Sequence, residues 1–106
     1  MAYAGTAGIP PAITVEIRDV IITATNSAAV QVCLGGVLTI DKSFMANSYY
    51  GIIVVGTGTV RLSGSIITGN SFGLFTFDGG NIISFVNNRI YGNQVDGAPT
   101  KSVYQR

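Results

Sequence analysis

The sequence repeats itself with a period of about 22 residues, and this repeat limits what the chain can fold into. Apolar residues recur in step in three sets of positions: Val15, Leu38, Val60 and Ile83; Ile17, Ile40, Leu62 and Phe85; and Ile22, Met45, Ile67 and Ile90. Two further sets keep one constant spacing: Val30, Ile52 and Leu74, and the glycines Gly36, Gly58 and Gly80. A fixed period between about 20 and 50 residues is typical of solenoid proteins.

Within each repeat, apolar and polar residues alternate, as in Leu38-Thr39-Ile40 and Val60-Arg61-Leu62. Alternation with a period of two indicates short β-strands, and no helical periodicity competes with it. Each strand can then pair in parallel with its equivalent in the next repeat, about 4.8 Å away. We therefore expect an all-β solenoid of about four rungs, in which each apolar set forms a ladder inside the coil.

The most regular repeat resembles a known family. Its sequence includes Gly51-Ile52-x-Val54, Gly56-x-Gly58, Val60-x-Leu62, Ser65-x-Ile67 and Asn70. This pattern is similar to the right-handed parallel β-helix repeat of the pectate-lyase-like superfamily, and the resemblance covers residues 13–94. The closing segment, residues 90–100, resembles the ends of bacterial β-helix repeat proteins. The resemblance implies a right-handed parallel β-helix and no particular activity, because this fold carries many functions.

The chain divides into a β-helix over residues 13–94 and two short flanking segments. Residues 1–12 are expected to form a lead-in that partly caps the first rung, with Pro10 and Pro11 at an edge, because proline cannot donate to a β-ladder. Residues 95–106 are expected to be a polar tail and a thin cap over the last rung. A one-residue insertion is expected near Asn87-Asn88. Open solenoid ends favour association with another chain.

Composition excludes several classes of partner. The net charge is +1, and the six basic residues are spread over 106 residues without a cluster, so nucleic acid and anionic membranes are not expected partners. Cys33 is the only cysteine, which excludes an intrachain disulfide. No apolar run is long enough to span a membrane. The first residues lack the pattern of a secretory signal, so a cytoplasmic location is expected unless the chain is a segment of an exported protein.

The sequence gives no support for catalysis or for a cofactor. It contains no histidine, which removes the usual triads and Cys/His metal sites. Pectate lyases hold calcium with clustered carboxylates and use an arginine as base, and no matching motif is present here. Asp19 and Asp41 are one repeat apart, so we expect them to stack beside Arg18 and Lys42 as a surface charge network. We therefore predict no catalytic residue, no metal site and no cofactor.

One strand of each repeat is apolar on both of its faces. If Val30, Ile52 and Leu74 point inward together with Val32, Val54 and Thr76, the alternate residues form a patch on the outside. These residues are Cys33, Ile53, Val55, Phe75 and Phe77. A contiguous exposed apolar patch usually marks a contact surface, and closed homo-oligomers are the commonest assemblies. The patch therefore predicts self-association into a homo-oligomer.

Polar and aromatic residues also recur where the chain is expected to turn. Asn70 and Asn93 are expected to form a ladder of side-chain amides between successive rungs. Four aromatic residues lie near one corner of the coil and are candidates for packing or for weak sugar contact: Tyr49, Tyr50, Phe72 and Tyr91.

These patterns favour a non-catalytic β-helix module that acts through self-association or protein contact. Two alternatives remain open from the sequence. One is a carbohydrate-binding or degenerate polysaccharide-lyase-like protein, and the other is a segment of a larger adhesin.

Overall fold

The computed structural model describes residues 2–3, 7–9, 14–23, 26–33 and 35–103, which form strands and turns without any helix. No described segment is therefore a helix that could cross a membrane. The strands, in chain order, are β1 (Ala2–Tyr3), β2 (Ala7–Ile9), β3 (Thr14–Arg18), β4 (Ile21–Thr23), β5 (Ala28–Cys33), β6 (Val37–Asp41), β7 (Phe44–Ala46), β8 (Tyr50–Val55), β9 (Thr59–Ser63), β10 (Ile66–Thr68), β11 (Phe72–Phe77), β12 (Asn81–Phe85), β13 (Arg89–Tyr91) and β14 (Lys101–Val103).

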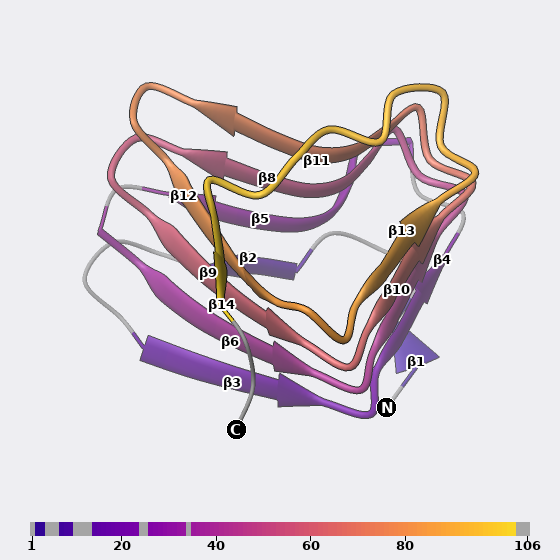
Figure 1. Cartoon of the computed structure of the whole chain (residues 1–106), viewed down its shortest axis with the longest axis horizontal. Coiled ribbons are helices and arrows are strands. Elements are labelled where there is room, and N and C mark those ends of the chain that lie inside the picture. The colour runs from indigo at the N-terminus through magenta and orange to yellow at the C-terminus, as the bar shows by residue number, and fades with distance from the viewer. Residues whose placement is uncertain (1, 4–6, 10–13, 24–25, 34, 104–106) are drawn as a thin grey trace.

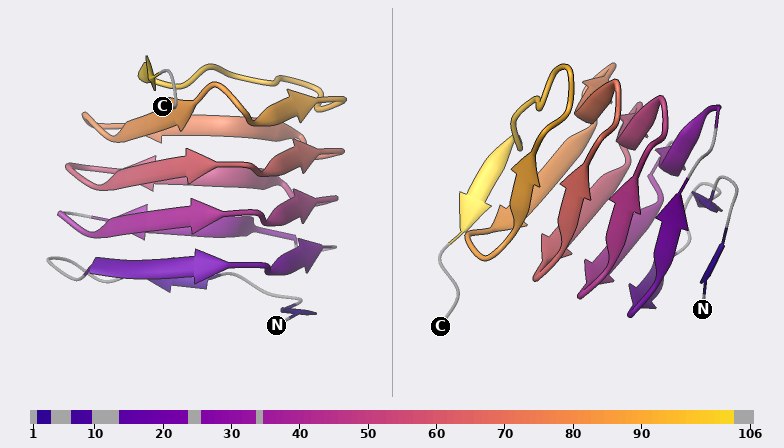
Figure 2. Two further views of the ribbon diagram at one scale, coloured as in Figure 1. Left: turned by 60° about the horizontal axis from the view of Figure 1, so that its bottom comes forward. Right: turned by 90° about the vertical axis from the view of Figure 1, so that its right-hand side faces the viewer.

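The strands form three parallel sheets around one core (Figure 1). The first sheet has the order β1-β4-β7-β10-β13, the second β11-β8-β5-β2 and the third β14-β12-β9-β6-β3. The chain visits the first, second and third sheets in turn, so each circuit makes one rung and successive rungs stack (Figure 2). This arrangement confirms the predicted all-β parallel solenoid.

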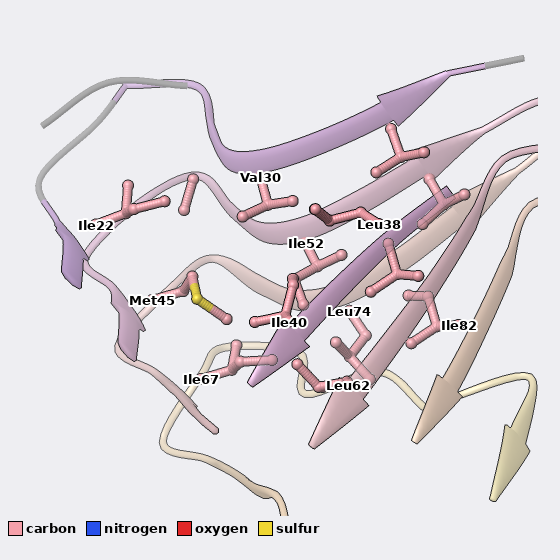
Figure 3. Close-up of a cluster of buried hydrophobic side chains, with 14 of the residues drawn as sticks. Ile22, Val30, Leu38, Ile40, Met45, Ile52, Leu62, Ile67, Leu74 and Ile82 are labelled. Carbon is pink, nitrogen blue, oxygen red and sulfur yellow. The ribbon is translucent and has the colours of Figure 1, made fainter. Parts of the chain in front are cut away.

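The core consists of apolar ladders contributed by all three sheets (Figure 3). Ile22 pairs with Met45, Met45 with Ile67, and Ile67 with Ile90, as the repeat predicts. The ladder of Val30, Ile52 and Leu74 is also confirmed. The following core side chains are at most 3% exposed: Ile22, Val30, Leu38, Ile40, Met45, Ile52, Leu62, Ile67, Leu74 and Ile82.

The sequence prediction is wrong about the last members of two ladders. Ile82, not Ile83, pairs with Val60, and Ser84, not Phe85, pairs with Leu62. The step from β9 to β12 is thus shorter by a single position than the step from β10 to β13. The extra residue therefore lies between Ser84 and Arg89, in the predicted region.

The register shift places a serine at a core position. Ser84 is 6% exposed, and its hydroxyl donates to the Phe85 carbonyl (3.1 Å) and accepts a hydrogen bond from Asn88 Nδ2 (2.9 Å). Both interactions satisfy a polar group that would otherwise be costly to bury. Ile83 and Phe85 are only half-buried.

Amide side chains connect the rungs at the corner between the first and second sheets. The Ser48 N–H donates to Asn70 Oδ1 (2.9 Å), and the Asn70 N–H donates to Asn93 Oδ1 (2.9 Å). The Nδ2 groups of Asn70 and Asn93 donate to the carbonyls of Met45 and Ile67, at 3.3 and 3.1 Å. The predicted amide ladder is confirmed.

A second ladder, at the corner between the third and first sheets, was not expected from the sequence. The Val20 N–H donates to Ser43 Oγ (3.2 Å), and the Ser43 N–H donates to Ser65 Oγ (3.1 Å). The Ser65 N–H donates in turn to Asn88 Oδ1 (2.9 Å). Side chains therefore satisfy turn amides on successive rungs at two corners of the coil.

Short segments continue the sheets at both ends of the described coil. β1 pairs with β4 and β2 with β5. After β13, Val95 bridges Phe72, and β14 pairs with β12. Pro10 and Pro11, which were expected at an edge, lie outside the described residues.

Candidate functional site

The outer surface of the second sheet carries a continuous group of large apolar side chains. From Ile52 to Val55 in β8 and from Leu74 to Phe77 in β11, residues alternate between the core and the outside, with Ile52, Val54 and Leu74 buried. Tyr50 and Phe72 precede these alternating segments, and their rings pack against that of the outward Phe75. The outward residues pair across the two strands as Tyr50 with Phe72, Ile53 with Phe75 and Val55 with Phe77. We call these six outward residues the aromatic face. Five of the six are half-buried, and Phe77 is 55% exposed.

The rings of this face pack against one another near the corner with the first sheet. Tyr50 lies 5.4 Å from Phe72 and 5.4 Å from Phe75 between ring centroids, and Phe72 lies 5.8 Å from Phe75. Tyr49 joins from the turn, with its centroid 4.7 Å from that of Tyr50. Offset and edge contacts at these distances are favourable for aromatic pairs, so the rings stabilise one another's positions.

The structure unites two groups that the sequence treats separately. Ile53, Val55, Phe75 and Phe77, predicted to mediate association, lie on the same surface as the corner aromatics Tyr50 and Phe72. The Cys33 backbone pairs with Val55, but its side chain is outside the described part of the structure.

Tyr91 lies at the same corner as Tyr50 and Phe72, but on the side that belongs to the first sheet. Tyr91 is in β13 of the first sheet, where it pairs with Thr68 and is 54% exposed. None of the ring contacts among the described residues includes it. Its strand, β13, belongs to the first sheet, whereas Tyr50 and Phe72 lie on strands of the second sheet.

A second apolar surface, on the outside of the first sheet, was missed by the sequence reasoning. Ile21, Phe44 and Ile66 stack in successive rungs, and Ile21 is 53% exposed. They form the floor of a groove of about 400 Å³, which we call the apolar groove. Its other lining residues are Asp19, Val20, Lys42, Ser43 and Gly64. The available signal was the pairs Ile21-Ile22, Phe44-Met45 and Ile66-Ile67, which place apolar residues on both faces of each strand.

A comparison with protein families identifies the fold. The model of the right-handed beta helix region matches residues 6–105, which is nearly the whole chain. The chain belongs to the right-handed beta helix family. Its parallel strands and stacked rungs are those of this family, and the pectate-lyase-like superfamily is consistent with them. The chain matches no curated protein and no solved structure.

The corner between the first and second sheets of this beta helix also holds a polar pocket. The pocket has a volume of about 400 Å³ and is lined by Asn26, Asn47, Ser48, Tyr49, Gly69 and Ser71. Tyr49 is 47% exposed, so one aromatic ring stands beside several amide and hydroxyl groups. This combination presents both a ring surface and hydrogen-bonding groups to a ligand.

The outer surface of the third sheet carries more of the described charged residues than that of either other sheet. Arg18 Nη2 lies 2.9 Å from Glu16 Oε2, and Arg18 Nε lies 3.6 Å from Asp41 Oδ2. The expected stacking of Asp19 on Asp41 is wrong, because the strand register places Arg18 beside Asp41. The Glu16 and Arg18 side chains are more than half exposed, so this charge network contributes little to stability.

The described residues contain no group of three or more His, Cys, Asp or Glu side chains that could hold a metal ion. A third pocket, of about 450 Å³, lies over this charged surface and extends to Phe85 and Asn87. Arg18 forms ion pairs with the two carboxylates nearest to it, Glu16 and Asp41.

Proposed function

We propose that this beta helix is a non-catalytic module that acts by associating with copies of itself through the aromatic face. The observation that carries the proposal is the continuity of that face. Six apolar side chains on two adjacent strands are directed away from the core, and four of them are aromatic. Phenylalanine and tyrosine side chains bury large areas with little loss of rotamer freedom, which suits them to the centre of a protein interface.

The size of the face sets the expected strength of association. The two strands that carry the face cover about 10 Å across the rungs, and six residues cover about 20 Å along a strand. This footprint, about 200 Å² on each copy, is smaller than a standard specific interface, which buries about 800 Å² on each partner. At about 25 cal/mol per Å² of apolar area, its burial offsets the cost of association without a large excess. We therefore expect a weak, concentration-dependent oligomer.

The first experiment is a comparison of solution mass by light scattering over a wide range of protein concentration. The measured mass of the parent protein should rise above the mass of one chain as its concentration increases. Phe77→Asp should remain at the mass of one chain, because it replaces the most exposed ring of the face with a charged carboxylate. Arg61→Asp, on the exposed outer side of the third sheet, is the control and should behave as the parent does. A parent chain that remains monomeric throughout would refute the proposal.

Carbohydrate binding at the corner is a second candidate function, favoured by the polar pocket beside Tyr49. Asn26 and Asn47 supply amide donors and acceptors there, and the exposed Tyr49 ring supplies an apolar surface. A glycan array followed by calorimetry would test this candidate, with Tyr49→Ala as the variant expected to lose binding. If no glycan binds, or if Tyr49→Ala binds equally well, the candidate fails.

A further inference from the structure

The aromatic face and the apolar groove lie on different sheets of one chain, and we propose that they bind each other between copies. In this arrangement, Phe77 of one copy inserts into the groove formed by Ile21, Phe44 and Ile66 of the next copy. This inference rests on the proposed self-association and specifies the surface that receives the aromatic face. The occupant of the groove is therefore a second copy of this chain.

The two surfaces have complementary relief. Phe77 is at the end of β11, and its 55% exposure makes it the most exposed large apolar side chain described. The groove is a recess of about 400 Å³ whose floor consists of apolar side chains. A protruding ring and an apolar recess both lose unfavourable contact with water when they meet.

The two surfaces also share a spacing. Val55 and Phe77 lie at equivalent positions of successive rungs, and so do Phe44 and Ile66. Rungs are about 4.8 Å apart in any parallel sheet. Two coils lying side by side with parallel axes can therefore place side chains of one face between those of the other over several rungs.

Charged residues beside the two surfaces also favour the pairing of the aromatic face with the apolar groove. Asp78 follows Phe77 directly and is exposed. The groove is lined by the exposed Lys42, and Arg89 continues its floor on the next rung beside Ile66. Asp19 also lines the groove, so the lining residues themselves hold one cation and one carboxylate. Insertion of Phe77 brings the Asp78 carboxylate to the surface that carries Lys42 and Arg89, and this attraction favours the pairing of the aromatic face with the groove.

This contact differs in symmetry from a face-to-face dimer. Each copy offers one aromatic face and one groove, so the contact is heterologous and leaves one unused surface of each kind at the ends of a pair. Assembly therefore continues into a ring or a filament. A two-fold dimer through the aromatic face alone would stop at two copies and would not involve the groove.

Mixing two variants tests the inference. Phe77→Asp damages the face and keeps the groove, whereas Ile66→Asp damages the groove and keeps the face. Each variant alone should have the mass of one chain at concentrations where the parent forms larger species. An equimolar mixture should form a complex of twice the chain mass and nothing larger, because it contains one intact face and one intact groove.

The outcomes separate the inference from the proposed function. If Ile66→Asp alone assembles as the parent does, the inference is wrong, while association through the aromatic face survives. If the mixture remains at the mass of one chain although the parent assembles, the inference is also wrong. A monomeric parent overturns both. Circular dichroism verifies that each variant is folded, and Ile21→Asp replaces Ile66→Asp if needed, since Ile21 is 53% exposed.

Discussion

At the scale of single residues, the polar groups that hold the corners were only partly predictable from sequence. Asn70 and Asn93 could be recognised because asparagine recurs at the same turn of the repeat. Ser43 and Ser65 form an equivalent ladder, but serine is common in any turn and gives no comparable signal. Asn88 could not be assigned a partner because the insertion beside it makes the register ambiguous.

Asn70 should be the most costly polar side chain to remove. It is 2% exposed, accepts from the Ser48 N–H and donates to the Met45 carbonyl. Asn70→Ala leaves both backbone groups without these partners, and we expect a loss of about 2 to 4 kcal/mol in the free energy of unfolding. Denaturation in urea measures this loss.

Asn81→Ala is the matched control for that measurement. The Asn81 side chain is exposed, and within the described part of the chain it makes only a long hydrogen bond, 3.5 Å, to the Gly79 carbonyl. Its removal should cost less than about 0.5 kcal/mol. Equal effects of the two substitutions would contradict a structural role for the amide ladder.

At the scale of the strands, the repeat predicts the fold and most of the register, but it fails at one strand. The spacing of the repeat varies by a single position, so the sequence does not determine the register of β12 against β9. Ile82 and Ile83 are both isoleucine, and either can continue the apolar ladder. In the observed register, Asn88 Nδ2 donates to the Leu62 carbonyl (2.7 Å) and the Phe85 carbonyl (2.8 Å). These hydrogen bonds depend on the shape of a turn, which apolar periodicity does not report.

Two alanine substitutions distinguish the two registers. Ile82 is fully buried, whereas Ile83 is half-buried on the outer side of the third sheet. Ile82→Ala should therefore lower the free energy of unfolding by about 2 to 5 kcal/mol, as expected for a buried isoleucine that leaves a cavity. Ile83→Ala should lower it by less than about 1 kcal/mol. The reverse order in urea denaturation would favour the register with Ile83 inside.

At the scale of the whole molecule, two of the three outer surfaces are apolar and one is charged. Sequence reasoning found the apolar strand of the second sheet, because β8 has four consecutive apolar residues, Ile52 to Val55. It missed the groove on the first sheet, because strands of three residues are too short to show a pattern. It also could not show that Tyr50 and Phe72 belong to the aromatic face, since that depends on how the chain turns at the corner.

Self-association should make thermal stability depend on protein concentration. Copies that bind only the folded state stabilise it by mass action, by about 1.4 kcal/mol when the free concentration is tenfold above the dissociation constant. For a domain of this size, this corresponds to an increase of about 5 to 10 °C in the midpoint of thermal unfolding. Phe77→Asp should unfold at a midpoint that does not change with concentration, because its aromatic face no longer binds. Asn70→Ala should unfold at a lower temperature but keep the concentration dependence, since it weakens the coil without altering either surface. A parent midpoint independent of concentration would contradict association of the folded chain in this range.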